Sequence, residues 1–470
     1  MSTSWSRDDA LVGGRWIRPG SVIEVENPAT GALVGSGARC GRAEVDLAVA
    51  AARAAHGDWS ALTPAARADH LDALVAELRA RRDELVAMTV AEVGAPVTVA
   101  ATWHVDVSLD ILASAARHAR THPFVQEHGA LVLHRRSAGV AALITPWNYP
   151  LYQLAAKAGS ALAAGCTVVH KPSELTPLSA YAFAEAAMRA GLPAGVVNLV
   201  PGTGAEVGVP LVADDRVDVV SFTGSTTVGR RVAASAVDHL ARVTLELGGK
   251  SASIVCDDAD LDSAVRWSVD ACMLNSGQTC SAWTRLLVPS DRLDEAVAIA
   301  AARADELVVG DPTDPATELG PLISADQHAK VAAVVSGAVA RGARVATRVT
   351  DVPSGGHYLR PVVLADLPVD DPASQQEIFG PVLVVHPYAD DEDALRIANG
   401  TVYGLSGAVW SADRDRARRL AARFDAGQVF VNEADYDVEA PFGGWKHSGS
   451  GREFGVEGLL EFTELTVVHL

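Results

Sequence analysis

The chain has 470 residues, of which 49% are hydrophobic and 21% are charged, so it can form two or three folded domains and is not disordered on the scale of a domain. Its formal net charge of −19 argues against nucleic acid or an anionic membrane surface as the main partner. The first residues lack the basic and apolar regions of a signal peptide, and no apolar run approaches the roughly 18 residues that a membrane span needs.

The first third of the chain predicts short strands followed by a helical wall. Residues 10–40 contain short apolar runs separated by Gly13-Gly14 and by the turn at 27–31. From 42 to 119 the sequence is alanine-rich, with apolar residues at three- and four-residue spacing, which is typical of amphipathic helices.

Residues 120–137 change character and predict a β-ribbon. Their side chains alternate around Gly129, and the tail at 459–470 is also strand-like and can pair with the ribbon. A ribbon that stands off the helices has unpaired edges, which proteins usually cover. We therefore expect these two segments to form an arm for oligomer formation.

Strands and helices alternate in two long blocks after the ribbon. In the first block, 139–247, strands are expected at 139–144, 166–170, 196–200 and 217–222. In the second, from about 251 to 431, they are expected at 253–256, 286–289, 362–364 and 382–385. Such alternation predicts parallel sheets with crossover helices, so we expect an α/β fold of the nucleotide-binding type.

Two segments at predicted strand ends have the chemistry of a nucleotide site. Residues 223–229 lie between a strand and a helix, where free backbone N–H groups favour a phosphate, although a plain tight turn fits the sequence equally well. Lys171 and Glu174 follow another strand, where they can hold the hydroxyls of an adenosine ribose or belong to a solvated loop.

Three residues have the chemistry of a thiol nucleophile and its partners. Cys280 follows Gly277-Gln278-Thr279, in a setting that allows either a nucleophile or a packed thiol. Thiolate attack on a carbonyl creates an oxyanion, for which Asn148 is a candidate donor unless it is an Asx-turn residue. Glu246 ends a predicted strand and is either a general base for water or a surface acid.

The other four cysteines suggest a reducing environment. All five are widely scattered and form no C-x-x-C pair, which predicts neither a disulfide framework nor a thiolate metal site. We expect a cytoplasmic protein without a bound metal, in which Cys272 is an ordinary buried thiol.

Taken together, these segments resemble the aldehyde dehydrogenase superfamily. The segments 145–150, 171–174, 222–225, 243–250, 277–280, 377–382 and 441–449 occur in its order and at about its spacings, over nearly the whole chain. The resemblance implies a Rossmann-like NAD-binding domain (1–119 and 138–247), an α/β catalytic domain (248–458) and a small β oligomerisation element (120–137 and 459–470). It also implies a homodimer or homotetramer, with Arg242, Arg452 and Glu464 in an ion-pair network near the subunit interface.

The resemblance assigns roles residue by residue. It implies that Cys280 forms a thiohemiacetal with the aldehyde, that Asn148 stabilises the oxyanion and that Glu246 activates the water which hydrolyses the thioester. Glu453 is similar to a second carboxylate near the water path, although a structural ion pair fits it as well. The implied cofactor contacts are Thr145, Pro146, Trp147, Lys171, Ser173, Glu174, Gly224, Ser225, Leu247, Gly248, Glu377 and Phe379.

The resemblance also implies a hydrolytic, NAD-dependent enzyme. Glu246 is the base that the CoA-acylating branch of the superfamily lacks. A carboxylate at Glu174 would repel the 2′-phosphate of NADP, so NAD is favoured, although Lys171 would still allow NADP. An NADP-dependent semialdehyde dehydrogenase is the alternative enzyme, and a non-catalytic structural member of the fold is a remote one.

The substrate is expected to be a small aldehyde whose tail lies among Trp103, Tyr149, Gln153, Ser281 and Tyr436. Ala156 replaces a bulky residue of several relatives, which suggests an open tunnel. The loop 433–439 has four acids and no Arg or Lys, so it either favours a cationic tail, as in an aminoaldehyde, or is simply solvated. A medium-sized aliphatic or aromatic aldehyde is the other candidate.

Overall fold

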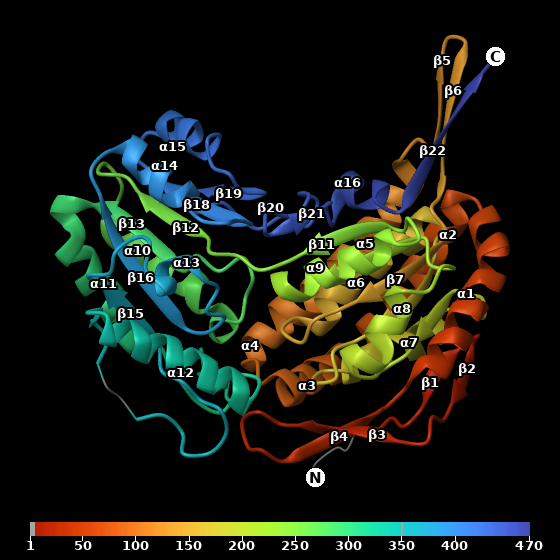
Figure 1. Cartoon of the computed structure of the whole chain (residues 1–470), viewed down its shortest axis with the longest axis horizontal. Coiled ribbons are helices and arrows are strands. Elements are labelled where there is room, and N and C mark those ends of the chain that lie inside the picture. Colours follow the sequence, from red (N-terminus) through yellow and green to blue (C-terminus); the bar gives the residue numbers. More distant parts are fainter. Residues whose placement is uncertain (1–4, 349–350) are drawn as a thin grey trace.

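The computed structural model describes residues 5–348 and 351–470, which form two α/β units side by side and a projecting arm (Figure 1). The first unit is built on an eight-stranded sheet in which β7 to β11 run parallel. Its strands, in spatial order, are β2 (Arg15–Ile17), β1 (Ala10–Val12), β9 (Val197–Leu199), β8 (Thr167–Lys171), β7 (Val140–Ile144), β10 (Val219–Thr223), β11 (Arg242–Glu246) and β21 (Gly449–Ser450).

Helices cover both faces of this sheet, as the predicted alternation requires. They are α1 (Arg42–Ala61), α2 (Pro64–Ala80), α3 (Arg82–Val93), α4 (Val97–Val99), α5 (Val107–Thr121), α6 (Pro150–Ala164), α7 (Leu178–Arg189), α8 (Val209–Val212), α9 (Thr226–Val237) and α16 (Gly455–Leu460), with π-helical turns η1 (Ala100–Asp106) and η2 (Gly204–Gly208). Helix α6 is central: it begins with Pro150, which suits a first helical position, and ends at Gly165 with φ 96°. Nearly all of its residues are buried, including the charged Lys157.

The second unit has a seven-stranded sheet with helices on its faces. Its strands, in spatial order, are β14 (Arg344–Val345), β15 (Val362–Ala365), β16 (Val382–Tyr388), β13 (Arg285–Pro289), β12 (Ala252–Val255), β18 (Ser406–Trp410) and β19 (Gln428–Val431). The helices are α10 (Leu261–Met273), η3 (Leu274–Gly277), η4 (Ser290–Arg292), α11 (Leu293–Glu306), α12 (Ala325–Ala340), α13 (Pro372–Gln375), α14 (Asp391–Asn399) and α15 (Arg414–Ala421). All strands except β14 are parallel to their neighbours, and their apolar side chains form the core of this unit.

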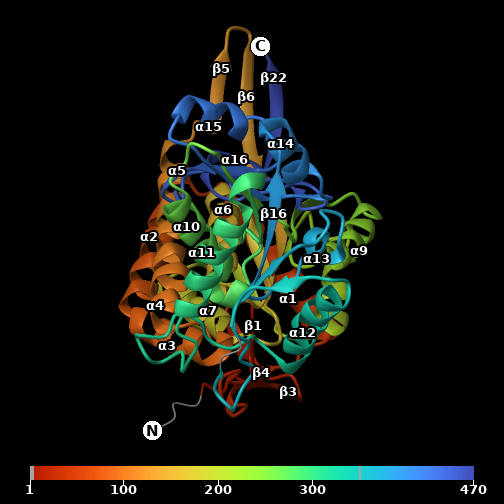
Figure 2. The same ribbon diagram turned by 90° about the vertical axis from the view of Figure 1, so that its left-hand side faces the viewer.

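The arm is a three-stranded antiparallel sheet that projects from the first unit (Figures 1 and 2). Strand β6 (Leu131–Ser137) lies between β5 (Val125–His128) and β22 (Thr463–His469), with Thr463 opposite Ser137 and His469 opposite Leu131. The expected pairing of the ribbon with the tail is therefore present. Apolar side chains on the arm are exposed, among them Val125, Leu465 and Val467.

Two small strand pairs complete the fold, and the last part of the chain lies in a different unit from the one that we expected. β3 (Val22–Glu26) and β4 (Leu33–Ala38) form an antiparallel hairpin, and β17 (Tyr403–Gly404) pairs antiparallel with the distant β20 (Trp445–Lys446). We expected residues up to 458 in the second unit, but β21 pairs with β11 and α16 packs on α5 and α6 of the first. The chain thus crosses back before residue 449 because its last helix completes the core of the first unit.

Over residues 5–348 and 351–470, no helix is long and apolar enough to cross a membrane. The same residues contain no group of three or more His, Cys, Asp or Glu side chains arranged to hold a metal ion. The five cysteines are free thiols, and Cys272 is buried as expected.

Candidate active site

Cys280 is presented by a strained turn between the two units. Helix α10 ends at Met273, and Asn275 and Ser276 then adopt left-handed φ values of 53° and 57°. This backbone conformation is uncommon outside glycine and is concentrated at functional sites. Gly277 continues the turn at φ 71°, and a Cβ there would lie 2.2 Å from the carbonyl carbon of Gly380. The turn therefore packs directly against the segment that contains Glu377.

The environment of Cys280 favours the protonated thiol at rest. Burial raises the pKa of the Cys280 thiol, and the carboxylates of Glu377, Glu246 and Glu453 raise it further, whereas the backbone amide of Ser281 acts in the opposite direction. Three carboxylates from three separate segments thus lie within electrostatic reach of one half-buried thiol. A reaction at this sulfur needs a group that takes its proton.

Asn148 is held against the Cys280 turn by two amide hydrogen bonds. Its Nδ2 donates to the Gln278 carbonyl (2.9 Å), and its own carbonyl accepts from Asn275 Nδ2 (3.0 Å). Asn275 was not expected from the sequence. Because a side-chain amide has two N–H groups, one can fix the orientation of Asn148 while the other remains available to a ligand oxygen. The arrangement can therefore donate to an oxyanion next to Cys280.

Glu246 lies at the end of β11 in an enclosed position. Its side chain is almost fully buried (4% exposed), and Oε2 accepts no hydrogen bond from the described part of the chain. Burial raises the pKa of Glu246 well above its usual range, and the charge of Glu453 raises it further, while the Lys157 ammonium lowers it. A carboxylate with an unused oxygen and a raised pKa can accept a proton near neutral pH.

Glu453 pairs with Lys157, a residue that the sequence analysis missed. Lys157 Nζ lies 2.5 Å from Glu453 Oε1, and the lysine side chain is only 1% exposed. The structural ion pair that we considered for Glu453 is thus present. The pair leaves Glu453 Oε2 without a hydrogen bond from any described residue. In the sequence, Lys157 is marked only as the single charged residue of the apolar stretch 151–164.

The candidate cofactor groove follows the carboxyl ends of β7, β8 and β10. Lys171 Nζ donates to the Pro172 carbonyl (2.8 Å) and to Glu174 Oε2 (3.2 Å), so the two charged residues meet at the edge of the sheet. Helix α9 begins after Ser225, whose hydroxyl accepts from the Val228 amide (3.4 Å). The first backbone N–H groups of α9, next to Gly224, are those that favour a phosphate.

The remaining predicted cofactor residues fall into two groups. Thr145, Pro146 and Trp147 follow β7, and the Trp147 ring meets that of Phe379 edge-on, with centroids 5.2 Å apart. Leu247 and Gly248 follow Glu246, and Glu377 Oε1 accepts from the amide of the adjacent Gly249 (3.0 Å). Ser173 stands apart, since its hydroxyl accepts from the Leu175 amide (3.2 Å) within its own turn.

A group of aromatic side chains lies next to the turn that contains Cys280. Tyr149 shares a hydrogen bond with Thr279 Oγ1 (2.8 Å), and its ring lies 5.8 Å from that of Tyr152. Tyr152 shares a hydrogen bond of 2.7 Å with the hydroxyl of Tyr436, and Trp103, on η1, packs on Tyr436. The structure thus brings three of the five predicted substrate residues together and adds Tyr152, which the sequence analysis missed.

The other predicted substrate residues are placed differently. Gln153 is buried, and its Oε1 accepts from Thr223 Oγ1 (3.1 Å) at the end of β10. Ser281 directly follows Cys280 and is half-buried. In the acidic loop, Glu433, Asp435 and Asp437 are exposed, whereas Glu439 pairs with Arg117 and with His118 (2.7 Å). The loop acids are therefore either solvated or paired.

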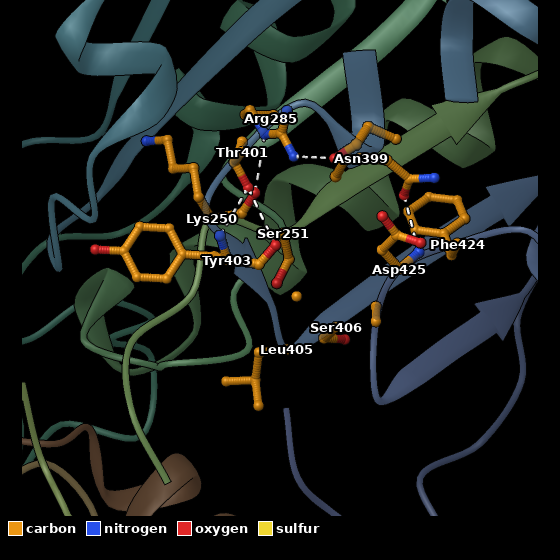
Figure 3. A pocket seen from close by; sticks show the side chains of 14 residues that line it. Lys250, Ser251, Arg285, Asn399, Thr401, Tyr403, Leu405, Ser406, Phe424 and Asp425 are labelled. Carbon is orange, nitrogen blue, oxygen red and sulfur yellow. Dashed lines mark hydrogen bonds between the residues drawn. The ribbon is translucent and has the colours of Figure 1, made fainter. Parts of the chain in front are cut away.

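A separate polar pocket lies in the second unit, where Lys250, Arg285 and Asn399 are among the residues that line it (Figure 3). Arg285 links the walls of this pocket, because its guanidinium donates to the carbonyls of Lys250 (2.8 Å), Ile397 (2.7 Å) and Ala398 (2.7 Å). Its cavity of about 10 Å³ has room for one water molecule. Burial lowers the pKa of the Lys250 ammonium to about 7. This pocket is too small for an organic substrate and stabilises the second sheet.

Comparisons with known proteins agree with this geometry. Residues 16–468 match the profile of the aldehyde dehydrogenase family. Over 463 residues the chain is 43% identical to a 3-succinoylsemialdehyde-pyridine dehydrogenase from a Pseudomonas species, with 97% of each chain covered. Its structure is similar to that of a variant of aldehyde dehydrogenase C from Pseudomonas syringae in complex with NAD+ and octanal (TM-score 0.97, 42% identity, 98% of this chain and 96% of that chain). It is also similar to a Mycobacterium tuberculosis aldehyde dehydrogenase in complex with NAD+ (TM-score 0.96, 39% identity, 100% and 99%). The chain therefore belongs to the aldehyde dehydrogenase family.

Proposed function

We propose that this protein oxidises an uncharged aldehyde to the carboxylic acid with reduction of NAD, through a covalent intermediate on Cys280. The observation that carries the proposal is the convergence of a thiol, an oriented amide and an enclosed carboxylate. Asn148 is hydrogen-bonded to the turn that contains Cys280, and the charge of Glu246 raises the pKa of the same thiol. These are a nucleophile, an oxyanion donor and a base.

The first step is attack of sulfur on the carbonyl carbon. Cys280 is a thiol at rest, so its proton leaves as the S–C bond forms, and Glu246 is the carboxylate with a free oxygen that can take it. The carbonyl oxygen becomes an oxyanion, which accepts from the second N–H of Asn148 and from the Cys280 backbone amide. The hydrogen bond from Asn148 to the Gln278 carbonyl fixes the first of these donors in advance.

Bound NAD supplies the hydride acceptor in this reaction. Loss of hydride from the thiohemiacetal carbon would leave a thioester on Cys280, and Glu246 would release the thiol proton to solvent before it acts again. Glu246 then takes a proton from water, whose oxygen forms the new C–O bond while the S–C bond breaks; the acid leaves, and the Cys280 thiolate takes the proton back from Glu246. Lys157 is paired with Glu453, and its positive charge partly offsets the repulsion between the Glu453 and Glu246 carboxylates.

The residues at the sheet edge fit NAD. The start of α9 offers backbone donors for a pyrophosphate, and the Lys171–Glu174 pair lies at the end of β8, where an adenosine ribose would be held. The Glu174 carboxylate would repel a 2′-phosphate, which makes NADP the weaker candidate. The NAD+ bound in the structures from Pseudomonas syringae and Mycobacterium tuberculosis supports the same choice.

The substrate class follows from the charges around the aromatic group. Lys157 is paired with Glu453, and Arg117 and His118 are paired with Glu439, so these cations are not free to hold an anionic tail beside the tyrosines. This disfavours the anionic semialdehyde, and the aromatic rings of Trp103, Tyr149 and Tyr436 favour a medium-sized aliphatic or aromatic aldehyde. The octanal bound to the Pseudomonas syringae relative is such a compound.

The proposal is tested by the formation of reduced nicotinamide, followed by its absorbance, with NAD or NADP and a panel of aldehydes. The panel contains octanal, succinic semialdehyde and aminobutyraldehyde. We expect activity with NAD and octanal, and Cys280→Ala to lower the rate by at least about 10³-fold. Cys272→Ala, a buried thiol on α10, is the matched control and keeps the activity. Turnover by Cys280→Ala would refute the proposed nucleophile.

We also propose that the arm assembles the protein into a homodimer or homotetramer in the cytoplasm. Among the described residues, no strand pairs with the outer edge of β5 or of β22, and apolar side chains such as Leu465 and Val467 are exposed on the arm. Arg242 and Glu464 form an ion pair near its base. Light scattering of the wild type and of Val467→Lys tests this, and a monomeric wild type would contradict it. The free state of all five cysteines supports a reducing compartment.

A further inference from the structure

Two tyrosine hydroxyls form an isolated polar pair among the aromatic side chains next to Cys280. Tyr152, on α6, and Tyr436, on the loop after β19, share a hydrogen bond of 2.7 Å. Their other neighbours are rings: Phe454 meets Tyr152 at a centroid distance of 5.6 Å, and Trp103 meets Tyr436 at 5.7 Å. A hydroxyl pair in such apolar surroundings can fix the orientation of a ligand, which apolar contacts alone do not.

The pair lies on the substrate side of the nucleophile. Tyr149 connects it to the Cys280 turn, because its hydroxyl bonds to Thr279 and its ring lies beside that of Tyr152. Cys280 and both members of the pair also pack against one apolar cluster. Burial raises the pKa of both phenols, and the charges of Glu453 and Cys280 raise it further, which agrees with this position.

The pair has one hydrogen-bond donor to spare. In a hydrogen bond between two hydroxyls, one O–H donates to the other oxygen, and the second O–H stays free. Within residues 5–348 and 351–470, no further hydrogen bond engages either hydroxyl. A free O–H in an apolar site is satisfied by an acceptor on the ligand, and the Asp437 carboxylate next to Tyr436, which raises the pKa of its phenol, favours an uncharged acceptor over an anionic one.

The loop that contains Tyr436 is fastened at its far end. Glu439 pairs with Arg117 and His118 of α5, and Val438 packs against the same apolar cluster as the two tyrosines. Tyr436 is therefore held in place before a substrate arrives, and its hydroxyl need not be ordered on binding.

We propose that the Tyr152–Tyr436 pair is a specificity-determining element that selects aldehydes with an uncharged hydrogen-bond acceptor, such as a ketone oxygen, in their tail. This inference rests on the proposed function, because it concerns the tail of the aldehyde that Cys280 attacks. An acceptor in the tail engages the free O–H, whereas a hydrocarbon tail of the same size leaves it unpaired.

The test compares β-benzoylpropionaldehyde with γ-phenylbutyraldehyde, which differ only by a carbonyl in place of a methylene. For the wild type we expect a kcat/KM about fivefold higher for the ketone, the effect of one net hydrogen bond. In the double variant Tyr152→Phe/Tyr436→Phe this ratio falls to about one, and the two single variants identify which hydroxyl faces the substrate. Tyr388→Phe, which removes a buried hydroxyl in the second unit, is the matched control and keeps the ratio.

Three outcomes would overturn the inference. The first is a wild-type ratio near one, and the second is a double variant that keeps the wild-type preference. The third is an equal loss with both aldehydes together with a lower unfolding temperature, because the pair would then only fasten the loop. Oxidation of neither aldehyde, nor of octanal, would instead refute the proposed function itself, so the two failures are distinguishable.

Discussion

Two replacements of Asn148, by alanine and by aspartate, test the proposed oxyanion site, because they should lower kcat by different amounts. One N–H of its amide is engaged by the Gln278 carbonyl at 2.9 Å, so the other is the one that a reacting oxygen can use. Loss of a single preorganised donor of this kind costs about 2.7–4 kcal/mol in the transition state, or about 10²–10³ in kcat. We therefore expect Asn148→Ala to lower kcat by that factor. Asn148→Asp keeps the size of the side chain but places a carboxylate where the oxyanion forms, so its loss is larger.

The assay is steady-state formation of reduced nicotinamide with octanal and NAD, with kcat and KM measured separately. Because the donor acts on the oxyanion and not on the ground-state carbonyl, most of the loss falls on kcat. Thermal unfolding provides the control, since Asn148→Ala also leaves the buried Gln278 carbonyl without its donor, at about 1–3 kcal/mol. A kcat within about fivefold of the wild type for both folded variants would refute the assignment.

Three further predictions concern charged groups. Lys157→Met leaves the buried carboxylate of Glu453 unpaired and destabilises the protein by about 3–5 kcal/mol, seen as a lower unfolding temperature. Adding Glu453→Gln recovers most of this loss, and no recovery would contradict the buried pair. Glu174→Gln removes the carboxylate that disfavours a 2′-phosphate, so the ratio of kcat/KM for NAD to that for NADP falls by at least about tenfold; an unchanged ratio would exclude Glu174 from cofactor selection. Glu92, near the end of α3, is fully buried with its carboxylate against the first amides of α7, and burial raises its pKa from 4.5 to about 7. Its stabilising effect is therefore complete below pH 4.5 and is lost as the pH rises through about 7, by about 3 kcal/mol. Unfolding temperatures of the wild type fall relative to Glu92→Gln between pH 5 and pH 8, and parallel pH dependences of the two would contradict this.

The sequence predicted most elements because their patterns are local. The apolar run at 139–144 became β7, and the runs at 217–222 and 382–385 became β10 and β16. Asn148 and Glu246 were expected at strand ends of α/β units, whereas their joint role with Cys280 was implied only by the resemblance to the aldehyde dehydrogenase superfamily. What local patterns do not contain is the return of the chain to the first unit after residue 440, which depends on the final packing of α16.

The missed site residues have weak local signals. Lys157 appears as one charge on an alanine-rich helix, and only its partner across 296 residues explains its burial. From the sequence alone, Tyr152 is indistinguishable from a core aromatic residue, and only the structure shows its hydrogen bond to Tyr436, on the loop after β19. Likewise, the acids at 433–439 formed a negative patch in the sequence, but Arg117 and His118 engage one of them from a distant helix. Ion pairs and hydrogen bonds between distant segments are therefore the part that required the structure.

The most direct test of the proposed chemistry is the intact mass of Glu246→Gln after incubation with NAD and octanal. If Cys280 forms the covalent intermediate and Glu246 activates water, this variant forms the thioester more slowly than the wild type, because it lacks the carboxylate that takes the thiol proton, but it then accumulates one octanoyl group per subunit, located on Cys280 by peptide mapping. About one equivalent of reduced nicotinamide per subunit appears with it, and turnover then becomes slow. Steady turnover at the wild-type rate, or an octanoyl group on any other residue, would contradict the account.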